Sequence, residues 1–369
     1  RLMRHRQHNP RFFELRENPY ERVTPHLLKS RASLANYYVL LSDSGKALFF
    51  DFGYDFLTGV PAGADRASRR PWLYSIPRLK EQYGVRKIDA VLLTHYHDDH
   101  VAGCSLMAEA EGAEIWAAEH VADVLERPDA YDLPCLWYDP VPVHRRLPPE
   151  RSIRWEEYEI TVYKLPGHTL YAAAAFVETD GKRVLIAGDQ YAGDDGLLEN
   201  YVYANRFEMD DYIGSAELYA RLQPDVILTG HWEPLWVKPG YFEALAERGR
   251  KLAELHRELL PLDEADFGTE GFAAELRPYQ SYAGAGSAFA VEAAVRNPYD
   301  KPSRVAVRLV LPQGWRATAE SQEAVAAPRG TATFSFEIEI PADCAPRRRA
   351  RIAADVILGY LVANQWAGG

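Results

Sequence analysis

Residues 94–100 read THYHDDH, and this short stretch decides how the rest of the chain is interpreted. Four of its side chains can bind a divalent cation, namely His95, His97, Asp99 and His100. The apolar run 88–93 comes directly before it, which predicts a buried strand that ends at a polar site. The alternative is a solvated polar loop that happens to be rich in histidine.

The spacing inside this stretch indicates which side chains can share an ion. Side chains of an extended segment alternate between two faces, so His95 and His97 point the same way and Tyr96 points elsewhere. Asp99 and His100 fall where a helix is expected to begin, and that turn can aim them at a second ion. Imidazole and carboxylate ligands suit Zn²⁺, Fe²⁺ or Mn²⁺, and no cysteine pair lies nearby to close a structural zinc site. We therefore expect two divalent ions, with zinc as the first candidate and iron or manganese as alternatives.

The pattern of residues 95–100 resembles the HxHxDH signature of the metallo-β-lactamase superfamily, and later motifs follow in that superfamily's order. They are His168 in LPGHT, Asp189 in LIAGD and His231 in ILTGH, each after an apolar run and each with a glycine directly before the ligand. Asp51 in LFFDFG is similar to the family's strand that ends in Asp-x-Gly. The resemblance spans roughly residues 34–260.

This resemblance implies the fold and the ligand sets. The fold would be an α/β four-layer αββα sandwich, in which two mixed sheets face each other and the metals lie at one edge. One ion would bind His95, His97 and His168, the other would bind Asp99, His100 and His231, and Asp189 would bridge them. Asp51 is expected to orient a ligand through hydrogen bonds without touching metal, the alternative being a helix or turn cap.

The implied chemistry is metal-assisted hydrolysis. Two cations that share a water lower its pKa towards neutrality and hold a bridging hydroxide, while one of them polarises the carbonyl or phosphoryl oxygen. Asp99 is then the catalytic proton shuttle to the leaving group, since it would touch both a metal and the nucleophile. We expect a small-molecule substrate, an ester, thioester or lactone, of the kind handled by hydroxyacyl-glutathione hydrolases and lactonases.

Aromatic side chains near the presumed mouth of the site suggest an apolar or sugar-like substrate group. Tyr191 is a candidate hydrogen-bond donor to a developing oxyanion, with simple packing as the alternative. Trp232 directly follows a ligand and is a second candidate substrate contact. The remaining aromatic residues of this set are Tyr54, Phe56, Trp72 and Trp236.

Other activities remain open on the same fold. A persulfide-dioxygenase-like enzyme binds one iron, so two metals per chain would exclude it. A flavodiiron-like oxidoreductase usually has an acidic residue in place of the second histidine of the motif, and His97 counts against it. A scaffold with a relic site is a third reading, and the seven competent ligands count against that one.

Composition limits the partners and the organisation. With 369 residues and 47% hydrophobic content, the chain is long enough for two domains. The net charge of −11 disfavours non-specific binding to nucleic acid or to an anionic membrane, although RNA-processing nucleases carry the same motif and a local basic patch is not excluded by composition. No apolar run approaches the roughly 20 residues of a membrane span.

Compartment and assembly are only weakly indicated. The three cysteines, Cys104, Cys135 and Cys344, are far apart, which predicts core residues and no disulfide framework. The chain starts without methionine and without an intact signal peptide, consistent with a fragment or a processed form. The absence of disulfides favours a cytoplasmic location, and the oligomeric state stays open.

The predicted domains are a hydrolase domain (1–262), a linker rich in glycine, alanine and acidic residues (263–286) and an accessory domain (287–369). Period-two alternation after residue 287 predicts a small antiparallel β-sandwich. Its turns loosely resemble fibronectin-III-like or NEW3-type domains that are appended to bacterial enzymes.

Finer elements are predicted within the hydrolase domain. Residues 1–33 are expected to lack a long element, and residues 53–77 to form a long loop, either a lid over the site or an aromatic packing cluster. The other expected elements are a hairpin (35–41 and 46–51), helices at 77–83, 119–126 and 210–222, strands at 114–118 and 225–229, a meander (151–189), and a helix at 241–260 with Phe242, Leu245, Leu252, Leu255 and Leu259 buried.

Overall fold

The structure is a computed structural model, and it describes residues 12–31, 33–54, 65–202, 204–259, 265–268 and 273–359. Its contacts divide the chain into two compact units. The first comprises residues 1–128 and 133–253, and the second comprises residues 129–132 and 254–369. Each unit is described by itself below.

The first sheet of the first unit has seven strands that follow one another in chain order. They are β1 (Tyr20–Thr24), β2 (Leu27–Ser30), β3 (Tyr38–Leu41), β4 (Lys46–Phe50), β5 (Lys87–Leu93), β6 (Glu114–Ala118) and β7 (Arg145–Leu147). Pairing is antiparallel from β1 to β4 and parallel from β4 to β7. Strands β3 and β4 are almost wholly buried apolar runs, as expected for strands covered on both faces.

The second sheet has the order β15-β14-β11-β10-β9-β8. Its strands are β8 (Ser152–Trp155), β9 (Tyr158–Lys164), β10 (Ala173–Thr179), β11 (Lys182–Gly188), β14 (Val226–Thr229) and β15 (Leu235–Trp236), with a separate small hairpin of β12 (Tyr191–Ala192) and β13 (Leu198–Glu199). In this second sheet, β11 and β14 are the one pair of described strands that run parallel, and the other neighbours are antiparallel. The carboxyl ends of β11 and β14 therefore meet at one edge of the sheet.

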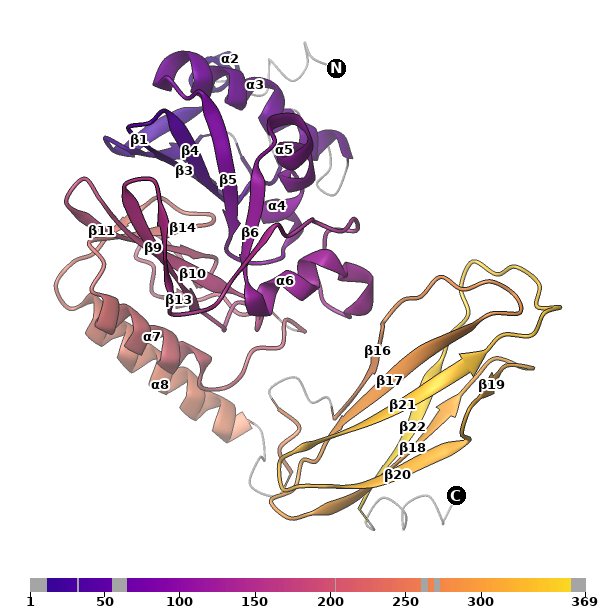
Figure 1. Ribbon diagram of the computed structural model, residues 1–369. Helices are drawn as coiled ribbons and strands as arrows, with labels where there is room; N and C mark the ends of the chain where they lie inside the picture. Colours follow the sequence, from indigo (N-terminus) through magenta and orange to yellow (C-terminus); the bar gives the residue numbers. More distant parts are fainter. Residues whose placement is uncertain are drawn as a thin grey trace. The chain divides into compact units, whose positions relative to one another are not determined.

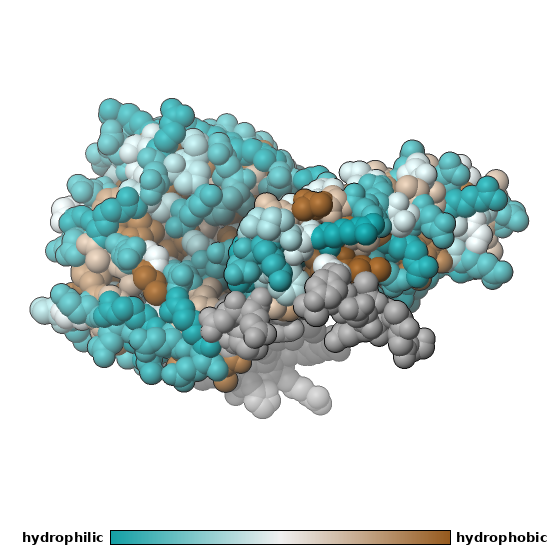
Figure 2. Space-filling model, turned by 90° about the horizontal axis from the view of Figure 1, so that it is seen from below, coloured by the Kyte–Doolittle hydropathy of each residue, from teal (hydrophilic) through white to brown (hydrophobic). Residues whose placement is uncertain are grey.

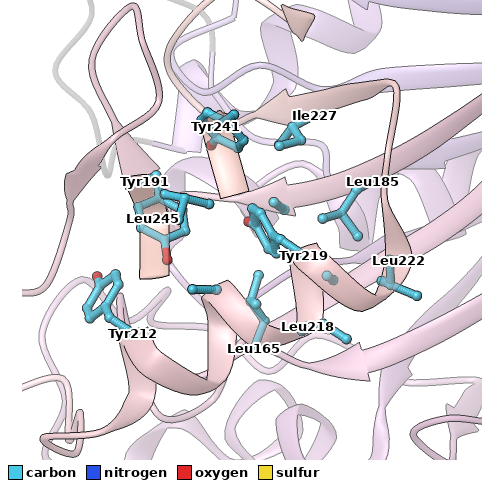
Figure 3. Packing of buried hydrophobic residues seen from close by; sticks show 13 residues of the cluster. Leu165, Leu185, Tyr191, Tyr212, Leu218, Tyr219, Leu222, Ile227, Tyr241 and Leu245 are labelled. Atoms are coloured by element: carbon cyan, nitrogen blue, oxygen red, sulfur yellow. The ribbon is translucent and has the colours of Figure 1, made fainter. Parts of the chain in front are cut away.

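Helices cover the outer face of each sheet (Figure 1). Beside the first sheet lie α2 (Phe12–Glu17), α3 (Asp65–Tyr83), α4 (Asp98–Val101), α5 (Cys104–Glu111) and α6 (Glu119–Glu126), and beside the second lie α7 (Asp211–Leu222) and α8 (Tyr241–Leu259). Figure 3 shows the apolar cluster that joins α7 and α8 to the second sheet, which includes Tyr212 and Tyr219 of α7, Leu245 of α8, and Leu185 and Ile227 of the sheet. The predicted four-layer αββα sandwich is confirmed.

The second unit has two antiparallel sheets. One has the order β16-β17-β21-β19 and the other the order β20-β18-β22. The strands are β16 (Ala274–Arg277), β17 (Ala288–Arg296), β18 (Ser303–Val310), β19 (Arg316–Ala317), β20 (Ser321–Ala326), β21 (Thr331–Glu339) and β22 (Ala353–Leu358). Alternate residues of β17, β18 and β21 are buried in a single apolar cluster. The predicted β-sandwich is confirmed, and one of its strands, β16, lies in the segment expected to be a linker.

The short 3₁₀ helix η1 (Pro128–Ala130) contains the position, after residue 128, at which the chain first passes from the first unit to the second.

Two finer predictions can be compared with the structure. The predicted loop 53–77 is helical from Asp65 onwards, as part of α3, and its residues 55–64, with Phe56, lie outside the described residues. Within residues 12–31 and 33, the segment expected to lack a long element contains only short ones, and its β1 and β2 belong to the first sheet. The domain boundaries at 262 and 286 stay predictions.

The predicted buried face of α8 is partly wrong. Leu255 and Leu259 are 42% and 76% exposed, whereas Gly249 and Ala253 are buried. A Cβ on Gly249 would lie 2.8 Å from the carbonyl oxygen of Tyr212, so the two helices approach closely at this glycine. The buried stripe therefore runs through Tyr241 and Leu245 and continues over the small residues, which allow close helix packing, and not over Leu255 and Leu259.

The face of the molecule drawn in Figure 2 is mainly polar where it is coloured. Away from the grey atoms, hydrophilic residues cover most of the face drawn in Figure 2, and hydrophobic residues appear there in small separate groups. None of the helices within the described residues has both the length and the apolar content needed to cross a membrane.

A carboxylate joins the two sheets at one end of the sandwich. Asp180, in the turn between β10 and β11, accepts hydrogen bonds from the Thr24 hydroxyl (2.6 Å) and the His26 backbone N–H (2.8 Å) at the turn between β1 and β2. Its second oxygen lies 2.6 Å from His26 Nδ1. Burial alone would raise the pKa of Asp180, but the hydrogen bonds from Thr24 and His26 lower it.

We expect Asp180→Ala to lower the free energy of unfolding by about 1–3 kcal/mol, since three donors lose a charged acceptor. The stabilisation should be present above the ordinary carboxyl pKa of about 4 and should disappear as the pH falls through the lowered value. Urea unfolding at pH 7 and at pH 3 measures both effects. Asp43→Ala, which removes a highly exposed carboxylate 3.6 Å from the same histidine, is the control and should change stability by less than about 0.5 kcal/mol. A loss no larger than that of the control would contradict the expectation.

Candidate metal centre

The motif of residues 94–100 runs from the end of β5 into α4. His97 is the extended residue before the helix, with φ −60° and ψ 143°, and Asp98 is the first helical residue. His95 and His97 form single bridges with Ala172 and Leu136, so both belong to extended segments. Their ring centres lie 4.6 Å apart, in agreement with side chains that share one face.

The other three ligand candidates come from the second sheet. His168 lies in the connection between β9 and β10, Asp189 directly follows β11, and His231 is the second residue after β14. Because β11 and β14 are parallel neighbours, Asp189 and His231 are delivered to the same edge. The structure thus brings all seven predicted ligand side chains together.

The first group contains His95, His97 and His168, whose ligand atoms lie within 4.8 Å of one another. His168 Nε2 is 3.1 Å from His97 Nδ1. Burial lowers the pKa of His95 and His168, and together with neighbouring histidines it lowers the pKa of His97 to about 3. These imidazoles are therefore neutral at pH 7, as metal binding requires.

The second group contains Asp99, His100 and His231. His231 Nε2 lies 3.2 Å from Asp99 Oδ2 and 3.1 Å from Asp189 Oδ2. Asp189 also approaches His100 Nε2 (3.2 Å) and, in the first group, His168 Nε2 (3.6 Å). Asp189 thus lies between the two groups, where a bridging ligand would be.

In and beside the second group, carboxylates and imidazoles lie close together and shift one another's pKa values. Burial alone would raise the pKa of Asp189, but His100 and His231 lower it well below its usual range. Burial alone would lower the pKa of His231, and hydrogen bonds to Asp189 and Asp99 raise it to about 9. The site therefore holds anionic oxygen ligands beside nitrogen ligands.

Three buried ligand atoms have no hydrogen-bond partner among the described residues: His95 Nε2, His100 Nε2 and Asp189 Oδ1. Buried polar atoms are normally paired, whereas these three are candidate ligand atoms that lie within 4.8 Å of one another, with His100 Nε2 and Asp189 Oδ1 3.2 Å apart. Two divalent cations bound by nitrogen and oxygen atoms would satisfy all of them, so the residues fit the metals that the motif implies.

The second nitrogen of four histidines is held by a neighbour, which fixes which nitrogen faces the metal. His95 Nδ1 is 3.0 Å from Thr94 Oγ1, and His168 Nδ1 is 2.5 Å from the carbonyl oxygen of Asn200. His100 Nδ1 is 2.8 Å from Asp51 Oδ2. His97 Nε2 lies 3.2 Å and 3.4 Å from the two polar atoms of the Asn205 amide.

Asp51 occupies the position expected of a residue that orients a ligand. Besides His100, it accepts hydrogen bonds from the backbone N–H (2.8 Å) and hydroxyl (2.7 Å) of Thr94. It adopts a positive φ of 61° directly after β4. One carboxylate thereby ties the end of β4 to both ends of the metal-binding motif.

Asn205 was missed in the sequence and is fully buried beside the first group. Its Oδ1 accepts from the Tyr96 hydroxyl (2.7 Å), and its Nδ2 donates to the carbonyl oxygen of His168 (3.0 Å). Asn200 Nδ2 likewise donates to the Asp189 carbonyl (2.9 Å). The presence of Asn200 and Asn205 in the connection after Asp189 was the only feature of the sequence that could have indicated these contacts, because loop residues show no periodic pattern.

The structure places the two candidate substrate-binding aromatic residues, Tyr191 and Trp232, in different surroundings. Tyr191 is buried in the apolar cluster, with its ring centre 5.5 Å from that of Tyr212 and 5.6 Å from that of Tyr219 (Figure 3). This corrects the expectation that it binds substrate, and the packing alternative describes its position. Trp232 is half-buried with its ring centre 6.0 Å from that of His231, so its substrate role stays a prediction.

Two further aromatic residues serve other contacts. The buried Tyr54 donates to Asp98 Oδ2 (2.9 Å), and Trp72 donates to Glu111 on α5 (3.1 Å). Trp236 lies in β15 and is exposed.

Comparison with known proteins gives a family and a fold. A family model described as the metallo-beta-lactamase superfamily matches residues 34–231, more than half of the chain. The chain is similar in structure to a B3 metallo-beta-lactamase with an active-site glutamic acid, at 19% identity and a TM-score of 0.50, over 66% of this chain and 92% of that chain. At this identity the similarity shows the fold alone.

Two further solved structures have lower TM-scores. One is the MIM-1 metallo-beta-lactamase from Novosphingobium pentaromativorans, at 17% identity and a TM-score of 0.48, covering 66% of this chain and 92% of that chain. The other is the DIM-1 metallo-beta-lactamase, at 17% identity and a TM-score of 0.46, covering 64% and 96%. No curated protein matches the chain.

Proposed function

Because the chain belongs to the metallo-beta-lactamase superfamily, we propose that it is a hydrolase that uses two divalent metal ions, with zinc as the first candidate. Its proposed substrate is a small ester, thioester or lactone. The observation that carries the proposal is the convergence of seven ligand side chains, in which buried ligand atoms of His95, His100 and Asp189 have no hydrogen-bond partner among the described residues.

Two divalent ions in this site would supply Lewis acidity and a water molecule of lowered pKa. The residues of the first group are prepared for an ion before it binds. Its three histidines are neutral, and Thr94, Asn205 and Asn200 hold the ring nitrogens that face away from the group. Little reorganisation of this group is then needed when an ion enters, which favours binding.

Asp99 is the proposed proton carrier. Burial alone would raise its pKa, but His100 and His231 lower it, so the carboxylate is ionised at pH 7 and can accept a proton. Its side chain is 18% exposed, compared with 5% for Asp189, which leaves the Asp99 carboxylate more accessible to a substrate. We assign it the transfer of a proton from the attacking water to the leaving group.

The proposed substrate class is supported by the surroundings of His231. This ligand is 29% exposed, and the indole of Trp232 lies beside it. An apolar surface next to an accessible site suits an uncharged acyl group better than a polyanion, and the net charge of −11 also opposes a polyanionic substrate.

The function is tested by metal analysis and a substrate panel. Protein purified without chelator should contain two metal ions per chain and should cleave at least one of a set of chromogenic esters, thioesters and lactones, with lactams and phosphodiesters as comparison. His97→Ala should lose metal and reduce turnover at least about 10³-fold while the chain stays folded. His144→Ala, which removes a histidine outside the ligand groups, is the matched control.

Three results would overturn the proposal. The proposal would be wrong if protein purified without chelator contained no metal. It would also be wrong if His97→Ala retained full turnover. A single iron per chain with oxygen consumption would support the persulfide-dioxygenase-like alternative.

A further inference from the structure

His231 differs from the other histidines of the centre. Each of the other four has a neighbour at the ring nitrogen that faces away from the metal groups. For His231 no such partner is found within the described part of the chain, and its ring is also the most exposed ligand at 29%. The position of its imidazole therefore depends on the backbone that carries it.

That backbone is held by residues of the other sheet, and Asn36 makes most of these contacts. Asn36, just before β3, donates from Nδ2 to the carbonyl oxygens of Thr229 (3.1 Å) and Trp232 (2.7 Å). Its own backbone N–H donates to the carbonyl oxygen of Gly230 at 2.5 Å. Three carbonyls around His231 are thus fixed by a single residue.

The turn also makes other hydrogen bonds, one of which joins the Gly230 N–H to the carbonyl oxygen of Gly188 at the end of β11 (2.8 Å). The Thr229 hydroxyl donates to the Trp232 carbonyl (2.9 Å) and accepts from the Trp232 N–H (3.1 Å), which closes the turn on itself. Tyr38 adds one bond to the Thr229 carbonyl (2.7 Å). Within the described residues, only Asn36 bonds to carbonyls on both sides of His231.

We propose that Asn36 is the positioning residue of the second metal group, and that its side-chain amide sets the affinity of the ion bound by Asp99, His100 and His231. This inference rests on the proposed two-metal function. An amide suits the task because its NH₂ group carries two donors, one for each carbonyl. A carboxylate of the same shape has no donor, and it would face the two carbonyls with a negative charge.

The test is a metal titration of metal-free protein with Zn²⁺, followed by competition with a chromogenic chelator. The wild-type protein should give two binding constants. In Asn36→Asp and Asn36→Ala, one Zn²⁺ binding constant should stay unchanged, and the affinity described by the other should fall about 10–100-fold. This is the usual effect of removing a partner that orients a ligand. The weakened constant should be the one that His231→Ala eliminates.

Asn205→Ala is the matched control from the other group. It removes an asparagine that contacts His97 and the His168 backbone, so it should weaken the other constant. A general loss of structure would instead lower both constants together in the Asn36 variants, and thermal unfolding of the metal-free proteins measures that loss directly. Asn36→Asp retains the size of the side chain and the backbone N–H, so it provides the result if the alanine variant does not fold.

The outcomes separate the inference from the function on which it rests. If the wild type binds two ions and both Asn36 variants keep both constants, or weaken them equally, the assignment of Asn36 is wrong and the function stands. If the wild type binds no ion or a single ion, the proposed function fails and the inference fails with it.

Discussion

Asp189→Ala is expected to eliminate the binding of both metal ions and to lower turnover about 10⁴-fold, the loss typical of removing a group on which the catalytic unit depends. Asp189 is the carboxylate, among the described residues, that approaches histidines of both groups: His168 in the first, and His100 and His231 in the second. In the two ligand sets that the motif implies, each histidine binds one ion, so no histidine variant should have so large an effect on both. Elemental analysis and turnover of the best substrate measure the two losses.

The matched control is Asp194→Ala, which removes an exposed carboxylate five residues further along the chain. It should leave both the metal content and the turnover unchanged. Asp189→Asn supplies a second comparison, because the amide keeps the shape of the side chain and loses its charge. If the alanine variant retained two ions per chain, Asp189 would not be the bridge between the groups.

Most of the ligands could be predicted from the sequence because they follow a buried strand. Strands β5, β11 and β14 are mainly apolar, and the first residue of the motif, Asp189 and His231 follow them within two residues. An apolar run followed by a glycine and a polar residue is a pattern within a few neighbouring residues, so it can be recognised without knowledge of the fold. The same reason explains why the hairpin β3–β4 and the strands β6 and β14 were predicted at nearly their observed positions.

Elements whose burial is set by their neighbours were predicted less well. The N-terminal strand β1 is an edge strand with a partly exposed centre, and its polar sequence carries no apolar run. In α8 the buried side is chosen by the close approach of Gly249 to Tyr212, which no spacing of leucines reveals. Helix α3 begins within a segment whose glycines and prolines favour a loop.

The residues that support the ligands were missed for a different reason. Asn36 and Trp232 are 196 positions apart, and Tyr96 and Asn205 are 109 apart. A single asparagine in a connection has no periodic partner, and its role exists only once two distant loops meet. Asp51 was found because it ends a strand and belongs to a motif, which the asparagines do not.

Gly230→Ala should be the second severe variant, although it changes no ligand. A Cβ on Gly230 would lie 1.8 Å from Asp189 Oδ1 and 2.8 Å from His100 Cε1, so both ligands must move. A displacement of about 1 Å at a reacting centre costs about 10²-fold in rate, and the added crowding should lower the free energy of unfolding by about 1–3 kcal/mol. Turnover, metal content and urea unfolding together measure the effect.

Gly214→Ala makes the same chemical change with the opposite expected sign. Gly214 lies in α7, and no atom comes within 4 Å of a Cβ placed there. Alanine in an exposed helical position should therefore raise the free energy of unfolding by about 0.5–1 kcal/mol and leave metal binding and turnover intact. The pair isolates the cause, since one added methyl group stabilises α7 and disrupts the metal centre only where Asp189 and His100 lie against the backbone. A Gly230 variant that retains both ions and wild-type turnover would show that the close approach of these ligands to β14 is not needed for the site.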